Sequence, residues 1–93
     1  MDEMIRYSGK AIGRVQGVGF RMFVRDNAGK LGLTGWVKNM PDGTVDFEAQ
    51  GREENLEKLF ALLREGNYFI KVHDLELDKI NPIMPEKGFV IKY

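Results

Sequence analysis

The sequence of 93 residues contains no cysteine, a single histidine (His73) and no long apolar run. The lack of cysteine excludes a disulfide framework, a thiolate nucleophile and every metal site built on thiolate ligands. One histidine likewise excludes a metal site that needs several imidazoles. No apolar stretch approaches the ~18 residues of a membrane-spanning helix. Much enzyme chemistry is therefore excluded at once, and a reducing cytoplasm is the expected location.

The chain also lacks an excess of charge of either sign, because 14 basic residues balance 14 acidic ones. This balance argues against a strongly cationic protein that binds nucleic acid or membrane surfaces, whose pI usually exceeds ~9. Basic residues are nevertheless concentrated in the first half, with seven of them and one acid, Asp26, between Met4 and Met40. An anion would be attracted to this half, although chance placement on a solvated surface explains the same counts.

A hydrophobic fraction of 43% with 30% charged residues is typical of a folded domain, and residues 1–93 are expected to form a single one. Alternating apolar and polar residues predict strands at 5–13, 34–39, 45–50 and 72–80, and a short strand at 89–93. In the strand at 45–50, the polar Asp46, Glu48 and Gln50 are expected on a wet face. Helical spacing predicts helices over 20–31 and from about Arg52 to Gly66. The order βαββαβ with an added terminal strand predicts a ferredoxin-like α+β sandwich, in which two helices pack on one face of a mostly antiparallel sheet.

The stretch between the first strand and the first helix, Gly13-Arg14-Val15-Gln16-Gly17-Val18-Gly19, is the most informative segment. Glycines at this point allow successive backbone N–H groups to converge on an anion at the positive end of a helix. The segment is neither a Walker A loop nor a dinucleotide fingerprint, because it lacks Gly-Lys-Ser/Thr and a third glycine.

Taken alone, two glycines between a strand and a helix indicate only a turn. Arg21 changes this interpretation, since a positive charge at a helix start is unfavourable against the dipole unless an anion binds there. Arg14 and Arg25 have no comparable position and are interpreted as surface charge.

Two motifs together resemble a known family: Gly13-Arg14-Val15-Gln16-Gly17-Val18-Gly19-Phe20-Arg21, and Gly35-Trp36-Val37-Lys38-Asn39 followed by Asp42-Gly43-Thr44-Val45. They resemble the two signatures of the acylphosphatase family, and the likeness spans essentially the whole chain. It implies a small cytoplasmic hydrolase, without metal or cofactor, that cleaves acyl phosphates into a carboxylate and inorganic phosphate. In that family the loop amides and the arginine bind phosphate, and the asparagine orients the attacking water. These roles would fall on Gln16, Gly17, Val18, Gly19, Phe20 and Arg21, and on Asn39.

The chemistry of such a substrate fits the residues independently. The carboxylate that leaves an acyl phosphate has a conjugate acid with a pKa near ~4, so its departure needs little help from a general acid. What remains is to neutralise the phosphoryl oxygens and to hold a water in line, which backbone amides, Arg21 and Asn39 are able to do. The amide of Asn39 does not titrate near neutral pH, so it is not a base.

Other functions remain open at this point. One is a non-catalytic anion-binding or regulatory module with the same fold, and another is a piece of a larger carbamoyl-transfer enzyme, which the length disfavours. The expected partners are a small acyl phosphate and competing phosphate or sulfate, with no nucleic acid, no membrane and a monomeric state. His73 is expected to pack or lie at a rim, Trp36 to pack in or near the core, and Met22 and Met40 to pack beside the site. Asp74, Glu76 and Asp78 are expected on a solvated strand face.

Overall fold

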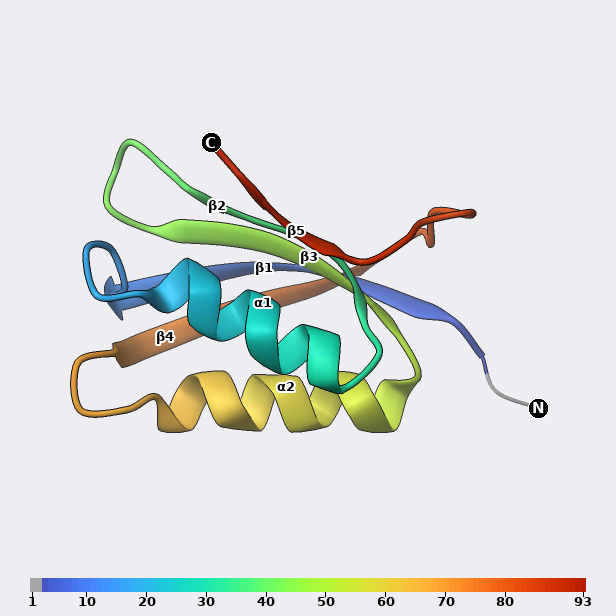
Figure 1. The fold of residues 1–93 in the computed structure, drawn as a ribbon, viewed down its shortest axis with the longest axis horizontal. Helices are drawn as coiled ribbons and strands as arrows, with labels where there is room; N and C mark the ends of the chain where they lie inside the picture. Colours follow the sequence, from blue (N-terminus) through green and yellow to red (C-terminus); the bar gives the residue numbers. More distant parts are fainter. Residues whose placement is uncertain (1–2) are drawn as a thin grey trace.

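A five-stranded sheet with two helices on one face makes up the structure, a computed structural model that describes residues 3–93 (Figure 1). Met1 and Asp2 lie outside the described residues. The elements follow the order β1 (Ile5–Arg14), α1 (Phe20–Lys30), β2 (Thr34–Asn39), β3 (Val45–Gly51), α2 (Glu53–Glu65), β4 (Lys71–Ile80) and β5 (Phe89–Lys92). The strand order is β4-β1-β3-β2-β5, and only the β2–β5 pair is parallel. The predicted ferredoxin-like fold is confirmed, with β5 as an added edge strand.

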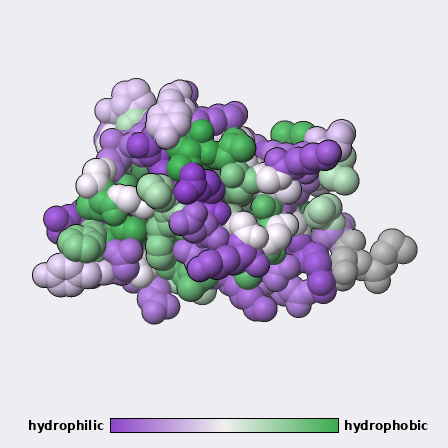
Figure 2. All heavy atoms as spheres, in the orientation of Figure 1, coloured by the Kyte–Doolittle hydropathy of each residue, from purple (hydrophilic) through white to green (hydrophobic). Residues whose placement is uncertain are grey.

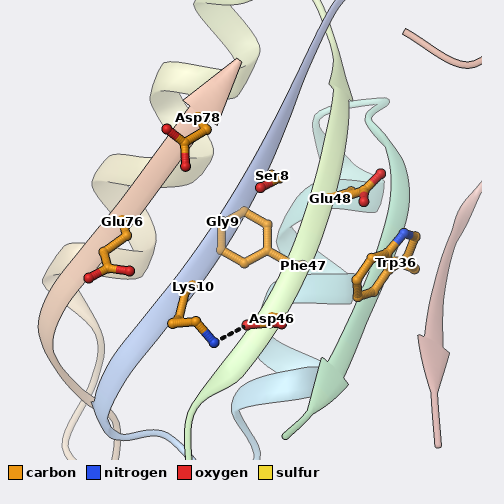
Figure 3. Close-up of a pocket in the computed structure, with 9 residues that line it drawn as sticks. All are labelled: Ser8, Gly9, Lys10, Trp36, Asp46, Phe47, Glu48, Glu76 and Asp78. Atoms are coloured by element: carbon orange, nitrogen blue, oxygen red, sulfur yellow. Dashed lines mark hydrogen bonds and ion pairs between the residues drawn. The ribbon is translucent and has the colours of Figure 1, made fainter. Parts of the chain in front are cut away.

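The register of the sheet explains which residues form the core. Gly9 of β1 lies opposite Phe47 of β3, which lies opposite Val37 of β2. Residues directly opposite one another share a face, so this row points toward the helices. Gly9 has to lack a side chain, because a Cβ there would lie 2.2 Å from Cζ of Phe47. The ring of Phe47 therefore fills the space over β1, as Figure 3 shows from the open side of the sheet.

Both helices bury the apolar stripes that the sequence predicted. These are Phe20, Val24 and Ala28 of α1 and Leu56, Leu59, Phe60 and Leu63 of α2. Glu53 and Glu54 occupy the first turn of α2, where the helix dipole favours negative charge, and Gly66 ends the helix with a φ of 64°. α1 ends one residue before the predicted Leu31, which becomes its C-cap. Neither helix is long and apolar enough to cross a membrane, as far as the described residues show.

The position of Trp36 on the open face of the sheet differs from the prediction that it packs in or near the core. Trp36 does not enter the core: it is half-buried on the face away from the helices, opposite Glu48. Strand alternation is the reason, because the neighbouring Val37 points inward and is fully buried. Figure 3 shows Trp36 on β2 and the exposed Glu76 and Asp78 on β4, at the two sides of this face. The solvated strand face predicted for the β4 acids is confirmed.

A second correction concerns the end of the open face near the β4–β5 connection (residues 81–88). Gln50, expected on a wet face, is only 1% exposed, because its side chain bonds to both N and O of Ile83 at 2.8 Å. Arg6 beside it is also 1% exposed. Its guanidinium donates to Glu48 at 2.7 Å, to Gln50 at 3.1 Å, and to both carboxylate oxygens of Glu86 at 2.7 and 3.2 Å. Buried polar groups thus attach the connection to β1 and β3.

Candidate functional site

The candidate site is built around the loop from Val15 to Gly19, at the end of the molecule where β1 leads into α1 and β2 turns into β3 (Figure 1). Gly17 has a φ of 74° and Gly19 a φ of 81°. Residues with side chains rarely adopt this left-handed conformation, which explains glycine at both positions.

The first turn of α1 leaves its backbone N–H groups available. Gly19 is the N-cap, no side chain caps the helix, and its first turn contains no acidic residue. The first N–H groups of a helix have no carbonyl partner within it, and the helix dipole makes this end positive. This end of α1 is therefore suited to an anion.

A cavity of about 160 Å³ opens beside this loop and α1. Its lining comes from the loop, the first turn of α1, the end of β2 and the C-terminal strand: Val15, Gly17, Gly19, Phe20, Arg21, Met22, Asn39, Ile91 and Tyr93. The fold thus brings five residues of the predicted site into one cavity, namely Gly17, Gly19, Phe20, Arg21 and Asn39. Another cavity, on the open face between Lys10, Trp36 and Glu76, contains none of the predicted site residues.

Arg21 is the cationic side chain of this cavity. Its guanidinium carbon lies 5.0 Å from the centre of the Tyr93 ring, a cation–π contact. No carboxylate within residues 3–93 forms an ion pair with Arg21, whereas Arg25, one turn further along α1, pairs with Asp26 at 3.2 Å. The N–H groups of Arg21 are therefore not neutralised by an acidic side chain of the described chain.

Asn39 is the last residue of β2 and lies opposite Val45, on the helix side of the sheet. Its side-chain oxygen, Oδ1, is buried and has no hydrogen-bond partner among the residues that the structure describes. Leaving a buried amide oxygen unpaired costs about 1–3 kcal/mol. Asn39 lines the same cavity as Arg21, so the unpaired acceptor in its side chain is a feature that stability alone does not explain.

Gln16 and Val18, the other two predicted loop residues, do not line the cavity. Val18 is half-buried and packs against the core. Gln16 donates from Nε2 to the carbonyl oxygens of Met40 and Thr44, each at 2.8 Å. The backbone of Gln16 was expected to bind phosphate, but this side-chain link between the loop and the β2–β3 turn was not predicted. A glutamine within a loop carries no sequence signal for such a contact.

The β2–β3 turn is itself ordered by local hydrogen bonds. The N–H of Met40 donates to the carbonyl of Thr44 at 2.9 Å, and Asp42 Oδ1 accepts from the hydroxyl and the N–H of Thr44 at 2.6 and 3.0 Å. The hydrogen bond from the Thr44 hydroxyl, and to a lesser extent the one from its N–H, lowers the pKa of Asp42. The turn that follows Asn39 is therefore held from within and, through Gln16, from the loop.

The remaining candidates lie away from the cavity. His73 is exposed on β4, as expected for a rim residue, and Arg14 is exposed at the end of β1. Met22 departs from expectation: it lines the cavity and is 55% exposed, so it does not pack as predicted. Nothing within residues 3–93 groups three or more residues able to bind a metal ion.

The fold and the site together define a small α+β domain with a glycine-containing loop suited to an anion, and with a cavity whose described lining includes a cation and a neutral amide but no serine, cysteine, histidine or side-chain carboxylate. A family model described as acylphosphatase matches residues 7–91. The chain is 52% identical to an acylphosphatase of Clostridium acetobutylicum, covering 97% of this chain and 99% of that one, and 49% identical to one of Clostridium beijerinckii, covering 97% and 100%. It also resembles the crystal structure of acylphosphatase from Bacillus subtilis, with a TM-score of 0.90, 39% identity, and 96% and 99% of the two chains covered.

The chain therefore belongs to the acylphosphatase family. Its function is that of an acylphosphatase, a hydrolase that converts acyl phosphates into a carboxylate and inorganic phosphate. The resemblance found in the two sequence motifs is confirmed, and the non-catalytic alternative is not favoured.

Proposed function

We propose that the cavity beside the β1–α1 loop is the catalytic site, in which the loop amides and Arg21 bind the phosphoryl group and Asn39 orients the attacking water. The observation that carries this proposal is the buried, unpaired Oδ1 of Asn39, a residue that lines the cavity together with Arg21. A carbonyl oxygen of this kind accepts a hydrogen bond from water.

The phosphoryl group is proposed to lie against the backbone from Gln16 to Arg21. The positive φ of Gly17 and Gly19 allows the loop amides to converge on one anion, and the uncapped start of α1 adds further N–H donors. Arg21 supplies a planar guanidinium that pairs with two phosphoryl oxygens at once. Charge that develops on these oxygens in the transition state would thus meet donors already in place.

Asn39 is proposed to act on the nucleophile. With Oδ1 accepting from the water, a lone pair of the water oxygen is left free to face phosphorus. Since the amide does not take up a proton, the proton lost by the water goes to a phosphoryl oxygen of the substrate. The bond from phosphorus to the carboxyl oxygen breaks, and the carboxylate leaves as a weak base.

We further propose that the enzyme works without a metal, as a cytoplasmic monomer in which one domain carries the whole site. One core joining both helices and the sheet supports the single domain. The balance of charge supports a small anionic substrate in place of nucleic acid or a membrane surface.

The test is steady-state hydrolysis of benzoyl phosphate in the presence of a chelator, with inorganic phosphate as competitor. Asn39→Ala is expected to lower kcat by ~10²–10³, the usual effect of losing a positioning group of this kind, while the inhibition constant of phosphate stays near wild type. Asn39→Asp should also fail, because its negative charge repels the phosphoryl oxygens.

Arg21→Ala is expected to lose phosphate affinity together with rate. Arg21→Lys should recover little of either, because a point charge does not replace a bidentate fork. Arg25→Ala, on the next turn of α1, is the matched control and should keep both. Loss of phosphate affinity with unchanged kcat in Asn39→Ala would assign Asn39 to phosphate binding and refute its role in placing water. Chelator-sensitive activity would refute metal independence.

A further inference from the structure

One wall of the cavity consists of apolar side chains from α1 and the C-terminal strand. Met22 lies in the first turn of α1 and is 55% exposed, and Tyr93 is 91% exposed. Ile91 of β5 is half-buried. All three line the cavity that contains Arg21 and Asn39. Figure 2 shows hydrophobic atoms gathered on the surface between α1 and β5.

The geometry of the sheet produces this wall. Ile91 lies beside Val37, whose side chain points toward the helices, so Ile91 points the same way. Alternation along the extended chain then directs Tyr93 to the same side. Ile91 and Tyr93 thus meet the first turn of α1, where Met22 projects.

Scattered apolar side chains on a surface need no explanation, but contiguous ones beside a polar cavity indicate a binding surface. The cavity, at about 160 Å³, is smaller than the ~300–1,000 Å³ of pockets that enclose a drug-sized ligand. A phosphoryl group bound by the loop and Arg21 therefore leaves the rest of the substrate at the rim. The ring of Tyr93, 5.0 Å from the guanidinium carbon of Arg21, lies directly beside that position.

We propose that Met22, Ile91 and Tyr93 form a subsite for the acyl group of the substrate, and that it favours acyl phosphates with an apolar, especially aromatic, acyl group. The proposal rests on the phosphoryl site proposed above. An apolar acyl group would remove these side chains from water when it binds, whereas a small or charged acyl group would gain little from them. Tyr93 has a second contact to offer, since aromatic rings pack edge-to-face or offset with one another.

The test compares benzoyl phosphate with acetyl phosphate, which share the phosphoryl group and differ in the acyl group. Met22→Ser and Tyr93→Ser are expected to lower the ratio of kcat/KM for benzoyl over acetyl phosphate by about tenfold, a change of the size seen for small alterations of an apolar contact. Met22→Leu and Tyr93→Phe retain the apolar surface and should keep the wild-type ratio. Tyr68→Ser removes an aromatic ring that is 84% exposed and lies outside the cavity, so it controls for the substitution itself.

An unchanged ratio in both serine variants would overturn the proposal, even if kcat/KM fell equally for the two substrates. If Tyr93→Ser lowered kcat/KM equally for both substrates and also weakened inhibition by phosphate, the ring would serve only to support Arg21, which would overturn its role in the subsite. Failure of the phosphoryl site itself is a different result, since Arg21→Ala would then retain wild-type activity on both substrates. Circular dichroism on each variant confirms that the fold is intact.

Discussion

Gln16 shows how one side chain joins two separate parts of the site. Its Nε2 donates to Met40 O and Thr44 O, so the loop and the β2–β3 turn are linked just beyond Asn39. Gln16 and Asn39 are far apart in the sequence, and neither the spacing nor the residue type indicates that they cooperate. The side chain of Gln16 therefore links these two parts of the site without lining the cavity.

Replacing this link should affect catalysis more than binding. Gln16→Leu removes two hydrogen bonds and is expected to lower the free energy of unfolding by about 1–3 kcal/mol. It should also lower kcat more than it weakens phosphate inhibition, because Asn39 loses its support while the loop glycines remain. Steady-state kinetics and urea denaturation measure the two effects.

Lys10→Met is the control for Gln16→Leu. Lys10 contacts the same hairpin through Thr44 Oγ1 at 3.2 Å and Asp46 at 2.8 Å, but it does so from the open face. The Lys10→Met variant should therefore keep kcat near the wild-type value. If both variants changed kcat equally, the effect of Gln16 would be one of general hairpin stability.

At the scale of elements, the β1–α1 loop places a glycine of left-handed conformation directly at the start of a helix. Gly19 is both a residue of positive φ and the N-cap of α1, and Phe23 N–H bonds to its carbonyl at 3.0 Å. A Cβ on Gly17 or Gly19 would meet nothing within 4 Å. A Cβ at either position therefore strains the backbone without clashing with the rest of the described chain.

Gly17→Val and Gly19→Val are accordingly expected to move the loop out of its left-handed conformation, which costs roughly 1–2 kcal/mol per residue to retain. The inhibition constant of phosphate should rise and kcat/KM should fall, with far-UV circular dichroism unchanged. Gly29→Ala, in the last turn of α1 without positive φ, should instead stabilise the fold by about 0.5–1 kcal/mol and keep activity. Wild-type kinetics in both valine variants would show that the loop is an ordinary turn with no role in binding phosphate.

At the scale of the whole molecule, Arg6 fastens the β4–β5 connection to the sheet. The connection leads into β5, whose Ile91 and the following Tyr93 line the cavity. Arg6 is buried and hydrogen-bonded to Glu48, Gln50 and Glu86. Removing one partner of a buried ion pair strongly destabilises a protein, because a charge is left buried without compensation. This network of hydrogen bonds and ion pairs around Arg6 thus helps to hold in place the strand that brings Ile91 and Tyr93 to the cavity.

The network predicts a loss of stability in acid. Burial alone would raise the pKa of Glu86, but hydrogen bonds and charge from Arg6 outweigh it and hold the pKa below its usual value. The folded protein therefore binds fewer protons at Glu86 than the unfolded chain does, so this stabilisation is complete above the unfolded pKa of ~4.3 and disappears as the pH falls through the folded value.

Glu86→Gln should cost about 1–3 kcal/mol at pH 6. The difference from wild type should shrink as the pH falls from 5 toward 3, which urea denaturation at each pH would measure. Glu65→Gln, exposed at the end of α2, is the control and should cost under about 0.5 kcal/mol at pH 6. A pH-independent difference for Glu86→Gln would show that the ion pair contributes little.

The pattern of residues along the chain was enough to predict the elements, their order, the ferredoxin-like fold and the family. Periodicity and glycine placement are local properties, and strands and helices form where apolar residues repeat with the matching period. The positive φ of Gly17 and Gly19 is also local, since it depends on a turn between two adjacent elements.

Contacts between distant segments could not be obtained in this way, because they depend on strand order and register. The pairing of β2 with β3 and β5 brings Asn39 and Tyr93 to the cavity of Arg21. Gln50 was expected to face water, yet both Gln50 and Arg6 are buried because the β4–β5 connection packs over them. Trp36 faces the open side because alternation gives the inward position to Val37. Which side chains end up unpaired, covered or exposed is therefore decided by how the elements pack against one another, after local patterns have set what the elements are.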